Sequence, residues 1–216
     1  IEYATDKIDL KKEVRVGSLI TASTWADGNA GGEDAEGLWS PPGDTNTFLA
    51  DIAKAKKTVQ GKTGFDPNCL VIDYATFLAL KECEAIAEKI KYTQKGVFGA
   101  ALLAALLELD EVLVGKAIKN SAIETKAGTE MTGARIWEVN AGKGMGFLFY
   151  RAPKLGLKVA TAGLQVRIAY EDDQPRRVTT WREPARHQDV YECAEETDIV
   201  RVHADLGYLF KDTYAT

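Results

Sequence analysis

Residues 66–115 read DPNCLVIDYATFLALKECEAIAEKIKYTQKGVFGAALLAALLELDEVLVG, and this stretch decides the fold. The four apolar residues Cys69–Ile72 lie between turn-forming residues, and so short an apolar run predicts a buried strand rather than a helix. Val112–Val114 predicts a second buried strand. Between the two, Ala100–Leu109 is apolar on all sides, which predicts a helix packed between other elements.

Asp73 directly follows the first of these strands and can begin a helix, because its carboxylate can accept the free amide protons of a first turn. Tyr74, Phe77 and Leu78 then lie at helical spacing on one face. The charged residues 81–84 interrupt this apolar stripe. The segment therefore predicts either two short helices or one helix that bends.

The N-terminal part of the chain predicts an extended start and two helices. The weak alternation of Ile1–Ile8 predicts the end of an extended arm, and Leu10–Thr24 carries apolar residues at helical spacing. After an acidic loop and a turn with two prolines, a second apolar stripe predicts a helix that ends at Gly61. Asp44 or Thr45 can cap the start of that helix.

The C-terminal part predicts mostly strands. Asn120–Gly133 is polar and predicts a loop, whereas Met145–Tyr150 predicts a central strand. Strict alternation in Leu164–Glu171 predicts a half-solvated strand, and a turn follows it. Further strands are predicted at Arg177–Arg182, Val190–Cys193, Asp198–Val202 and Tyr208–Phe210. Helices early and antiparallel strands late predict an α+β fold.

Composition indicates a chain that buries a core in one large domain or two small ones, since 45% of its 216 residues are hydrophobic. The net charge of −5 and the absence of a concentrated basic patch argue against a protein that binds DNA tightly. No apolar run is long enough to cross a bilayer. The start of the sequence predicts no secretory signal, and Ile1 in place of Met predicts processing or truncation.

No cofactor, metal or catalytic site is predicted. Gly61-Lys62-Thr63 suggests a phosphate loop, but Lys56 stands where that motif needs a glycine. Gly142–Gly146 fails the dinucleotide spacing and leads into a strand, so it predicts a hairpin or loop. His187 and His203 have no cysteine or carboxylate partners at metal-ligand spacing.

The cysteines and tryptophans are predicted to be mainly core residues. Cys69, Cys83 and Cys193 have no metal-type spacing and are predicted to be reduced. Tryptophan concentrates binding energy at interfaces, yet core packing is the first expectation for most of the four. These four are Trp25, Trp39, Trp137 and Trp181.

Several segments of the chain, taken in order, resemble segments of one known protein family. Glu13–Ile20, followed by Trp25, resembles the end of that family's spine helix, and Thr63–Ile72 resembles the strand that opens its axial domain. Asp198–Asp212 resembles its closing strands. The other matching segments are Leu38–Ser40, Asp51-Ile52, Lys89–Tyr92, Leu113–Gly115 and Trp137. On these segments the chain resembles the major capsid proteins of tailed bacteriophages.

The resemblance implies the Hong Kong 97-like capsid fold. In that fold a peripheral domain, here residues 1–61 and 160–216, carries a spine helix and long antiparallel strands, and an axial domain, residues 62–159, is inserted between its halves. A loop of the axial domain would face the local symmetry axis. Its subunit-interface candidates are Thr93, Gln94, Lys95, Gly96, Val97, Phe98 and Gly99.

One departure from the family limits what can be carried over. Relatives have an N-terminal arm and an extended hairpin before the spine helix, but only about ten residues precede it in this sequence. Those elements are therefore expected to be absent or to lie outside it. The covalent Lys–Asn bond of some relatives is not carried over, because its lysine lies on that hairpin.

The resemblance implies a structural, non-enzymatic subunit of an icosahedral capsid. Its partners would be copies of itself in pentamers and hexamers, with portal, scaffold and cementing proteins as further candidates. The shell would assemble in the host cytoplasm and enclose double-stranded DNA without sequence-specific binding, cofactor or membrane. Two alternatives stay open: an encapsulin-like nanocompartment that encloses enzyme cargo, and a phosphate-handling enzyme that uses Gly61–Thr63.

Overall fold

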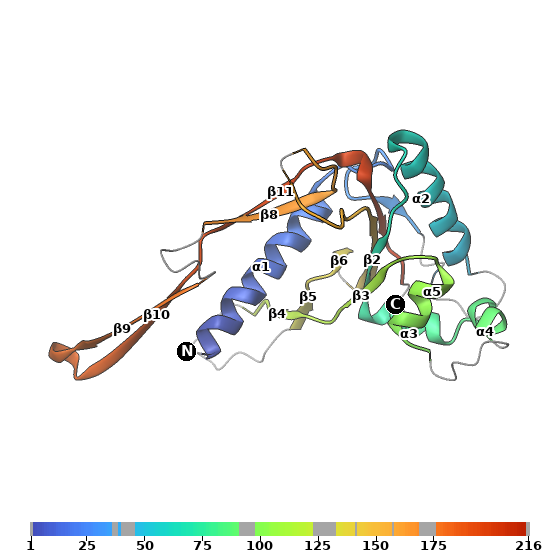
Figure 1. Ribbon diagram of the computed structural model, residues 1–216. Helices are drawn as coiled ribbons and strands as arrows, with labels where there is room; N and C mark the ends of the chain where they lie inside the picture. The colour runs from blue at the N-terminus through green and yellow to red at the C-terminus, as the bar shows by residue number, and fades with distance from the viewer. Residues whose placement is uncertain are drawn as a thin grey trace.

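The computed structural model describes residues 2–35, 39, 46–90, 98–122, 133–140, 142–156, 158–168 and 176–214. A body built on a mixed β-sheet lies at one end, and a long helix with two β-ribbons extends from it (Figure 1). The described helices are α1 (Glu2–Ala22), α2 (Phe48–Thr63), α3 (Tyr74–Lys81), α4 (Glu84–Ile90) and α5 (Ala100–Leu106), with short 3-10 turns at Pro184–Arg186 and Ala204–Leu206.

The central sheet has six described strands in the order β1-β12-β7-β2-β3, with β6 paired to β7. Neighbours β2 and β3 are parallel, as are β1 and β12, and the remaining pairs are antiparallel. The strands are β1 (Glu33–Asp34), β2 (Cys69–Asp73), β3 (Glu111–Gly115), β6 (Glu138–Asn140), β7 (Lys143–Phe149) and β12 (Gly207–Lys211).

Helices cover both faces of this sheet, which explains why its inner strands are apolar without alternation. Along β2, Leu70 and Ile72 belong to a buried cluster that they share with α2, α3, α4 and α5. Val71 points the other way, into a second cluster that includes Ile20 of α1. The core of the body is therefore two apolar layers with the sheet between them.

Three buried tryptophans each lie over a glycine in a strand of the central sheet. A Cβ atom added at Gly146 would stand 2.6 Å from a ring carbon of Trp39, and one at Gly207 would stand 2.5 Å from a ring carbon of Trp25. Such distances are far shorter than ordinary contacts, so only glycine leaves room for the rings. The pairs are Trp25 with Gly207 of β12, Trp39 with Gly146 of β7, and Trp137 with Gly115 of β3.

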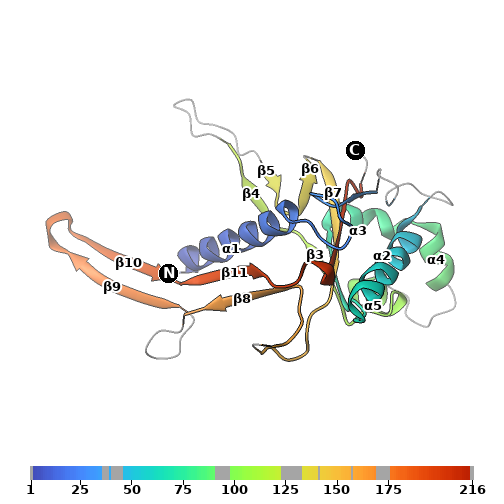
Figure 2. The same cartoon turned by 90° about the horizontal axis from the view of Figure 1, so that it is seen from above.

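Outside the central sheet, three two-stranded ribbons leave the body. Two of them, β8 with β11 and β9 with β10, follow one another along α1 and continue beyond its N-terminal end (Figure 2). The strands are β4 (Ile118–Asn120) with β5 (Gly133–Arg135), β8 (Gly163–Arg167) with β11 (Thr197–Arg201), and β9 (Arg177–Glu183) with β10 (Gln188–Ala194).

The predicted centre of the fold is confirmed. Cys69–Ile72 and Val112–Val114 lie in neighbouring parallel strands, and the strand predicted at Met145–Tyr150 is the middle strand of the sheet. Asp73 caps α3, because its Oδ2 accepts the amide proton of Ala75 at 2.9 Å. The segment that follows forms two helices rather than one bent helix.

The predicted extended arm at Ile1–Ile8 is wrong, because the described residues from Glu2 onward form the first turns of α1. The weak alternation covers few residues, and the good helix formers that follow let the helix extend to its acidic first turn. Helix boundaries also differ: α2 passes Gly61 and ends at Thr63, where Gly64 takes the left-handed conformation with φ 74°. The predicted caps Asp44 and Thr45 lie outside the described residues.

Strands β4 and β5 have no counterpart in the sequence predictions, although they flank the polar stretch that was predicted as a loop. Each has only three residues, which is too short for a periodic pattern to stand out. Among the described helices, none is both long enough and apolar enough to span a membrane.

Candidate assembly surface

The ribbon of β8 and β11 carries an apolar face that this chain leaves uncovered. In its antiparallel register Leu164 lies opposite Val200 and Val166 lies opposite Asp198, so this face is apolar except for Asp198. We call this the ribbon face, and its four outermost side chains are between 43% and 60% exposed. They are Val166, Ile168, Val200 and Val202.

The ribbon face qualifies the prediction of a half-solvated strand at Leu164–Glu171. The strand exists and its described apolar residues alternate as predicted, but β8 ends at Arg167 and Tyr170 lies outside the described residues. Side chains expected to be buried, such as Val166, are instead exposed. An alternating strand whose apolar side meets solvent is typical of a surface that another chain covers.

Strands β9 and β10 form a hairpin that we call the arm, residues 176–195. Its turn contains Pro184–Arg186, and His187 at φ 51° closes it. In the register of the hairpin, Trp181 pairs with Val190 on one face, whereas Tyr191 pairs with Thr180 on the other. Trp181 is 44% exposed and Tyr191 is 54% exposed, so neither face is covered by this chain.

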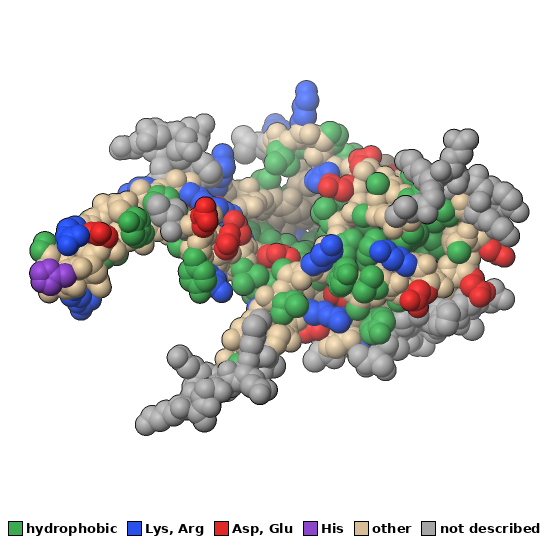
Figure 3. All heavy atoms as spheres, turned by 90° about the horizontal axis from the view of Figure 1, so that it is seen from below, with side chains coloured by type: hydrophobic (Ala, Val, Ile, Leu, Met, Phe, Trp, Pro, Cys, Tyr) green, Lys and Arg blue, Asp and Glu red, His purple; other side chains and the backbone are tan. Residues whose placement is uncertain are grey.

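Apolar side chains therefore alternate with charged ones along a projecting hairpin (Figure 3). A two-stranded hairpin without a covered face has marginal stability in water. Core packing was predicted for most of the four tryptophans, and Trp181 is the one that lies outside the core, since the other three are buried. Trp181 is therefore the tryptophan that could anchor an interface with another chain.

Cys193 also lies on the arm, opposite Val178, and is only partly buried. The prediction of core cysteines is therefore confirmed for Cys69 and Cys83 and wrong for Cys193. Its alternating context comes from a ribbon rather than from the sheet in the body. All three cysteines are free.

Four charged side chains join the base of the arm to α1, and we call them the ionic ring. Glu195 accepts hydrogen bonds from Lys12 Nζ at 2.9 and 3.1 Å and from Arg176 Nε at 2.7 Å. Asp9 pairs with Lys12 at 3.0 Å and also with the Arg176 guanidinium. Positive and negative groups alternate around the ring, so each charge has two partners of opposite sign.

The ionic ring keeps both carboxylates charged at neutral pH. Burial of Glu195 opposes its ionisation, but hydrogen bonds from Arg176 and Lys12 outweigh burial and lower its pKa from the ordinary 4.5. Hydrogen bonds from Lys12 and Arg176 likewise lower the pKa of Asp9 from the ordinary 3.8. The two carboxylates of the ring therefore lose their charge only in acid.

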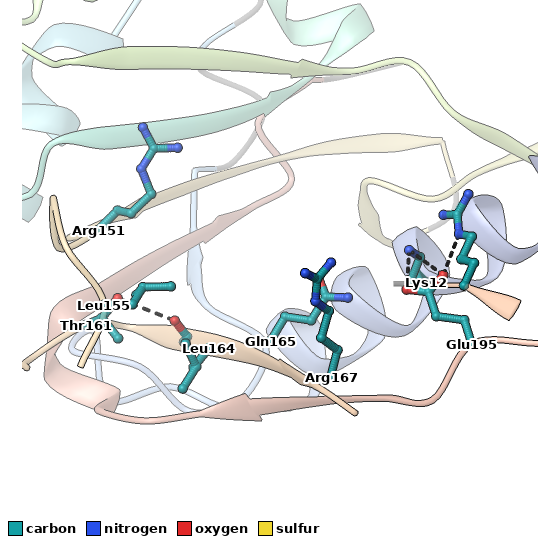
Figure 4. A pocket seen from close by; sticks show the side chains of 10 residues that line it. Lys12, Arg151, Leu155, Thr161, Leu164, Gln165, Arg167 and Glu195 are labelled. Carbon is teal, nitrogen blue, oxygen red and sulfur yellow. Dashed lines mark hydrogen bonds and ion pairs between the residues drawn. The ribbon is translucent and has the colours of Figure 1, made fainter. Parts of the chain in front are cut away.

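Two cavities border these features. One, of about 650 Å³, lies beside the ionic ring and also contacts Arg151 and Arg167; Figure 4 shows Lys12 reaching Glu195 at one end of it. The other, of about 280 Å³, lies between α1, the central sheet and the β8–β11 ribbon and has an aromatic lining that includes Trp25 and Trp137. Neither cavity contains a pair of carboxylates or a histidine among its lining residues.

Most of the loop predicted to face a symmetry axis, Thr93–Val97, lies outside the described residues. Its last two residues are attached to the body. Phe98 packs against Phe77 with ring centroids 5.8 Å apart. Gly99 precedes α5, and its carbonyl oxygen accepts hydrogen bonds from the first turns of that helix. Contact of this loop with other subunits stays a prediction.

The motifs that could have carried chemistry have structural roles. Gly61–Thr63 forms the last turn of α2, where Lys62 donates to the carbonyl of Ala26, so no phosphate-binding loop precedes a helix there. Gly142 turns the chain from β6 into β7, as the hairpin prediction requires. His187 and His203 are exposed, and no group of three potential metal ligands exists among the described residues.

Sequence reasoning missed the ionic ring. Lys12 and Glu195 are separated by 183 positions, so no local spacing indicates that they meet. The only local signal was the position of Arg176 and Glu195 at the two ends of an alternating hairpin, where opposite charges can close the neck. Trp181 was recognised as a possible anchor, and its exposure fits that role.

Comparison with known proteins finds one similar sequence of known name and solved structures of similar fold. No family model matches the chain. A protein of Burkholderia phage BcepMu named major capsid protein is 30% identical over 137 residues, which is 63% of this chain and 43% of that protein. The chain thus spans less than half the length of this relative.

Two solved structures match the chain over almost its whole length. A phage-related protein from Bordetella bronchiseptica RB50 has a TM-score of 0.79 and 21% identity, covering 100% of this chain and 67% of that one. A chain of Mycobacterium phage Che8 has a TM-score of 0.55 and 13% identity, covering 99% and 62%. This chain therefore has the mixed α and β fold of these two proteins.

Proposed function

We propose that this chain is a structural subunit of an icosahedral phage capsid that self-assembles into pentamers and hexamers around double-stranded DNA. The observation that carries the proposal is the arm together with the ribbon face. Both are extended elements with exposed apolar side chains, and both leave a body that already has two complete apolar layers. Support also comes from the sequence match to a phage major capsid protein.

The proposed arrangement is Hong Kong 97-like, with α1 as the spine helix. Residues 1–61 and 160–216 would form the peripheral domain, and residues 62–159 would form the axial domain. The loop Thr93–Gly99 would then face the local axis of a pentamer or hexamer. Heterologous contacts between the arm of one copy and a different surface of the next close into a ring when their rotation divides a full turn.

The electrostatics of the chain suit a container. Packaged DNA repels itself strongly, and a shell that bound it tightly would need concentrated positive charge. The chain has 27 Lys plus Arg against 32 Asp plus Glu, and many of the described cations pair with carboxylates of the same chain. Portal, scaffold and cementing proteins are further proposed partners.

No specific observation favours either alternative. The phosphate-handling enzyme loses its site, because Gly61–Thr63 ends a helix. An encapsulin-like nanocompartment would use the same kind of shell and differs only in its contents. The contents of the particle therefore distinguish a phage capsid from a nanocompartment. The proposal of a non-enzymatic role applies to both kinds of shell.

The proposal is tested by electron microscopy and sedimentation velocity of the full-length protein purified at high concentration. Rings of five or six subunits, or closed shells, are expected. Shells purified from phage-producing cells should contain double-stranded DNA; enzyme cargo instead of DNA would replace the phage function with the compartment function. A protein that remains monomeric at every concentration, with and without its phage partners, would contradict self-assembly.

The same assay can test the arm with a pair of matched variants. Trp181→Ala removes the exposed indole of the arm, whereas Tyr3→Ala removes an even more exposed aromatic ring from the start of α1. If the arm is an assembly contact, Trp181→Ala should reduce the assembled fraction at least about tenfold, since buried tryptophans are common binding hot spots. Equal assembly of the two variants would exclude Trp181 as an anchor.

A further inference from the structure

The arm is attached to the rest of the molecule almost entirely through its base. Residues 177–194 are all described, and each is exposed or only partly buried. None of them belongs to either apolar cluster of the body. Next to the base, Arg15 of α1 contacts β11 through the carbonyl of Thr197 at 3.3 Å and the carboxylate of Asp198 at 3.7 Å. The angle of the arm is therefore determined where the ionic ring lies.

The ionic ring connects both ends of the arm to one face of α1. Arg176 directly precedes β9 and Glu195 directly follows β10, so their hydrogen bond closes the neck of the hairpin. Asp9 and Lys12 lie one turn apart on α1, and each contacts one end of the neck. Separating the arm from α1 would therefore break the Lys12–Glu195 and Asp9–Arg176 contacts together, and would leave the Asp9–Lys12 and Arg176–Glu195 pairs in place.

The opposite half of α1 is fixed to the body. Ile20 and Gly17 are buried, and a Cβ atom added at Gly17 would stand 3.2 Å from a methyl carbon of Ile136. Glu13 accepts a hydrogen bond from the indole of Trp137 at 2.5 Å. Helix α1 is therefore a rigid rod of about 30 Å, anchored in the core at one end and holding the arm at the other.

We propose that the ionic ring of Asp9, Lys12, Arg176 and Glu195 is a latch that sets the angle between the arm and α1. Closed, as in this structure, it holds the arm in line with the helix; open, it lets the arm pivot about its base. Because the arm has no apolar attachment of its own, loss of one ring charge is enough to populate the open position. The ring differs from an ordinary surface pair because the Glu195 side chain is only 4% exposed.

The latch stays closed at neutral pH, and it opens when one residue of the ionic ring loses its charge. The charged groups that face Glu195 are Lys12 from α1 and Arg176 from the arm, and Asp9 completes the set. Salt acts mainly on the outer part of the ring, since Asp9 is 51% exposed whereas Glu195 is shielded. Protonation of the carboxylates opens the ring only below their ordinary pKa range.

In a shell, the angle of the arm would decide how neighbouring subunits meet. Subunits around five-fold and six-fold positions differ in their mutual inclination, and a latch with two positions accommodates both. This consequence rests on the proposed capsid function. The latch itself is a property of the single chain and does not depend on assembly.

The latch is tested by the distance between two spin labels, at Ser18→Cys on α1 and Thr180→Cys on the arm, in the full chain. Both positions are exposed, and Cys193→Ser removes the accessible native thiol while Cys69 and Cys83 remain buried. The distance is measured by pulsed electron paramagnetic resonance at a concentration at which sedimentation velocity shows monomers. One narrow distance distribution is expected for the parent chain at pH 7.

Glu195→Gln keeps the shape of the side chain and removes its charge. It should raise the open population about tenfold, because a hydrogen bond to a charged group is typically worth a factor of this order. The matched control is Asp189→Asn, which removes a carboxylate from the Arg182–Asp189 pair inside the arm, 3.0 Å across, without touching α1. The control should keep the parent distribution, and identical distributions for the two variants would overturn the latch.

Electron microscopy of the same variants separates the latch from the capsid proposal. An open arm in monomeric Glu195→Gln supports the latch even if the parent chain forms no particles, an outcome that would count against the capsid function alone. If the parent forms uniform shells, Glu195→Gln should give particles of altered size or shape. Unchanged shells together with an open monomeric arm would overturn the role of the latch in curvature.

Discussion

The body and the arm of this molecule use the same residue type in opposite ways. Trp39 in the body is completely buried, lies over Gly146 and packs edge-on against Phe48 with centroids 4.9 Å apart. Trp181 in the arm is 44% exposed and has only Val190 opposite it in the hairpin. One indole ring contributes to folding, and the other is available to a different molecule.

The contrast extends to the means of attachment. The body is held by apolar contacts on both faces of a sheet, which resist salt and need no exact charge state. The arm is held by four charges at its base. A molecule built in this way can change the position of its arm without unfolding its body, so the mutations that cost the most stability should differ from those that move the arm.

The sharpest test of this contrast is the substitution of each tryptophan. Trp39→Ala should destabilise the chain by about 3–5 kcal/mol, because it opens a large cavity and removes the hydrogen bond of the indole to Asp51 at 2.7 Å. Urea denaturation followed by far-UV circular dichroism measures the change. A loss below about 1 kcal/mol would mean that the aromatic layer is not the main support of the body.

The glycines beneath the tryptophans give a second, smaller effect. Gly146→Ala should cost about 1–3 kcal/mol, because the added methyl group would overlap the ring of Trp39, itself fixed by its neighbours. Gly61→Ala is the matched control, since nothing lies within 4 Å of that position and alanine is a better helix former. The control should be neutral or more stable, and the same sign for both variants would contradict the packing argument.

The sequence predicted the body because its signals are local. A short apolar run between turn residues identified β2, and the carboxylate of Asp73 at the strand end identified the start of α3. The Trp–Gly pairs were not predicted, since Trp39 and Gly146 are more than a hundred positions apart. Only the folded sheet brings each glycine beneath a ring.

The arm was predicted as strands but not as an arm. Alternation in Arg177–Arg182 indicates a strand, yet it does not say which face, if either, is covered by the same chain. The ionic ring was likewise hidden, because Asp9 and Lys12 look like ordinary charges on a solvated helix. The start of that helix was even predicted to be extended. Apolar periodicity predicts burial, whereas the apolar side chains of the arm, such as Trp181, are exposed in the single chain.

The third substitution, Trp181→Ala, should leave the stability of the body unchanged. The free energy of unfolding should change by no more than about 0.5 kcal/mol, because the side chain is exposed and its removal creates no cavity. The same denaturation experiment used for Trp39→Ala measures it, so the two tryptophans can be compared directly. A loss comparable to that of Trp39→Ala would show that the arm is part of the folding unit.

The last prediction concerns the pH dependence of the ionic ring. Because the folded state lowers the pKa of Glu195, its contribution to stability is complete above the ordinary carboxyl pKa of 4.5 and disappears as pH falls through the lowered value. The parent chain should therefore exceed Glu195→Gln in unfolding free energy by about 1 kcal/mol between pH 5.5 and 7, with the difference shrinking below about pH 4.

Asp189→Asn provides the control for this pH profile, since its exposed pair within the arm should contribute no more than about 0.5 kcal/mol at any pH. A difference between parent and Glu195→Gln that stayed constant down to pH 3 would mean that the substitution acts through packing rather than charge. The profile thus decides whether the arm is joined to α1 by electrostatics, as the geometry of the ring requires, or by contacts of the kind that hold the body.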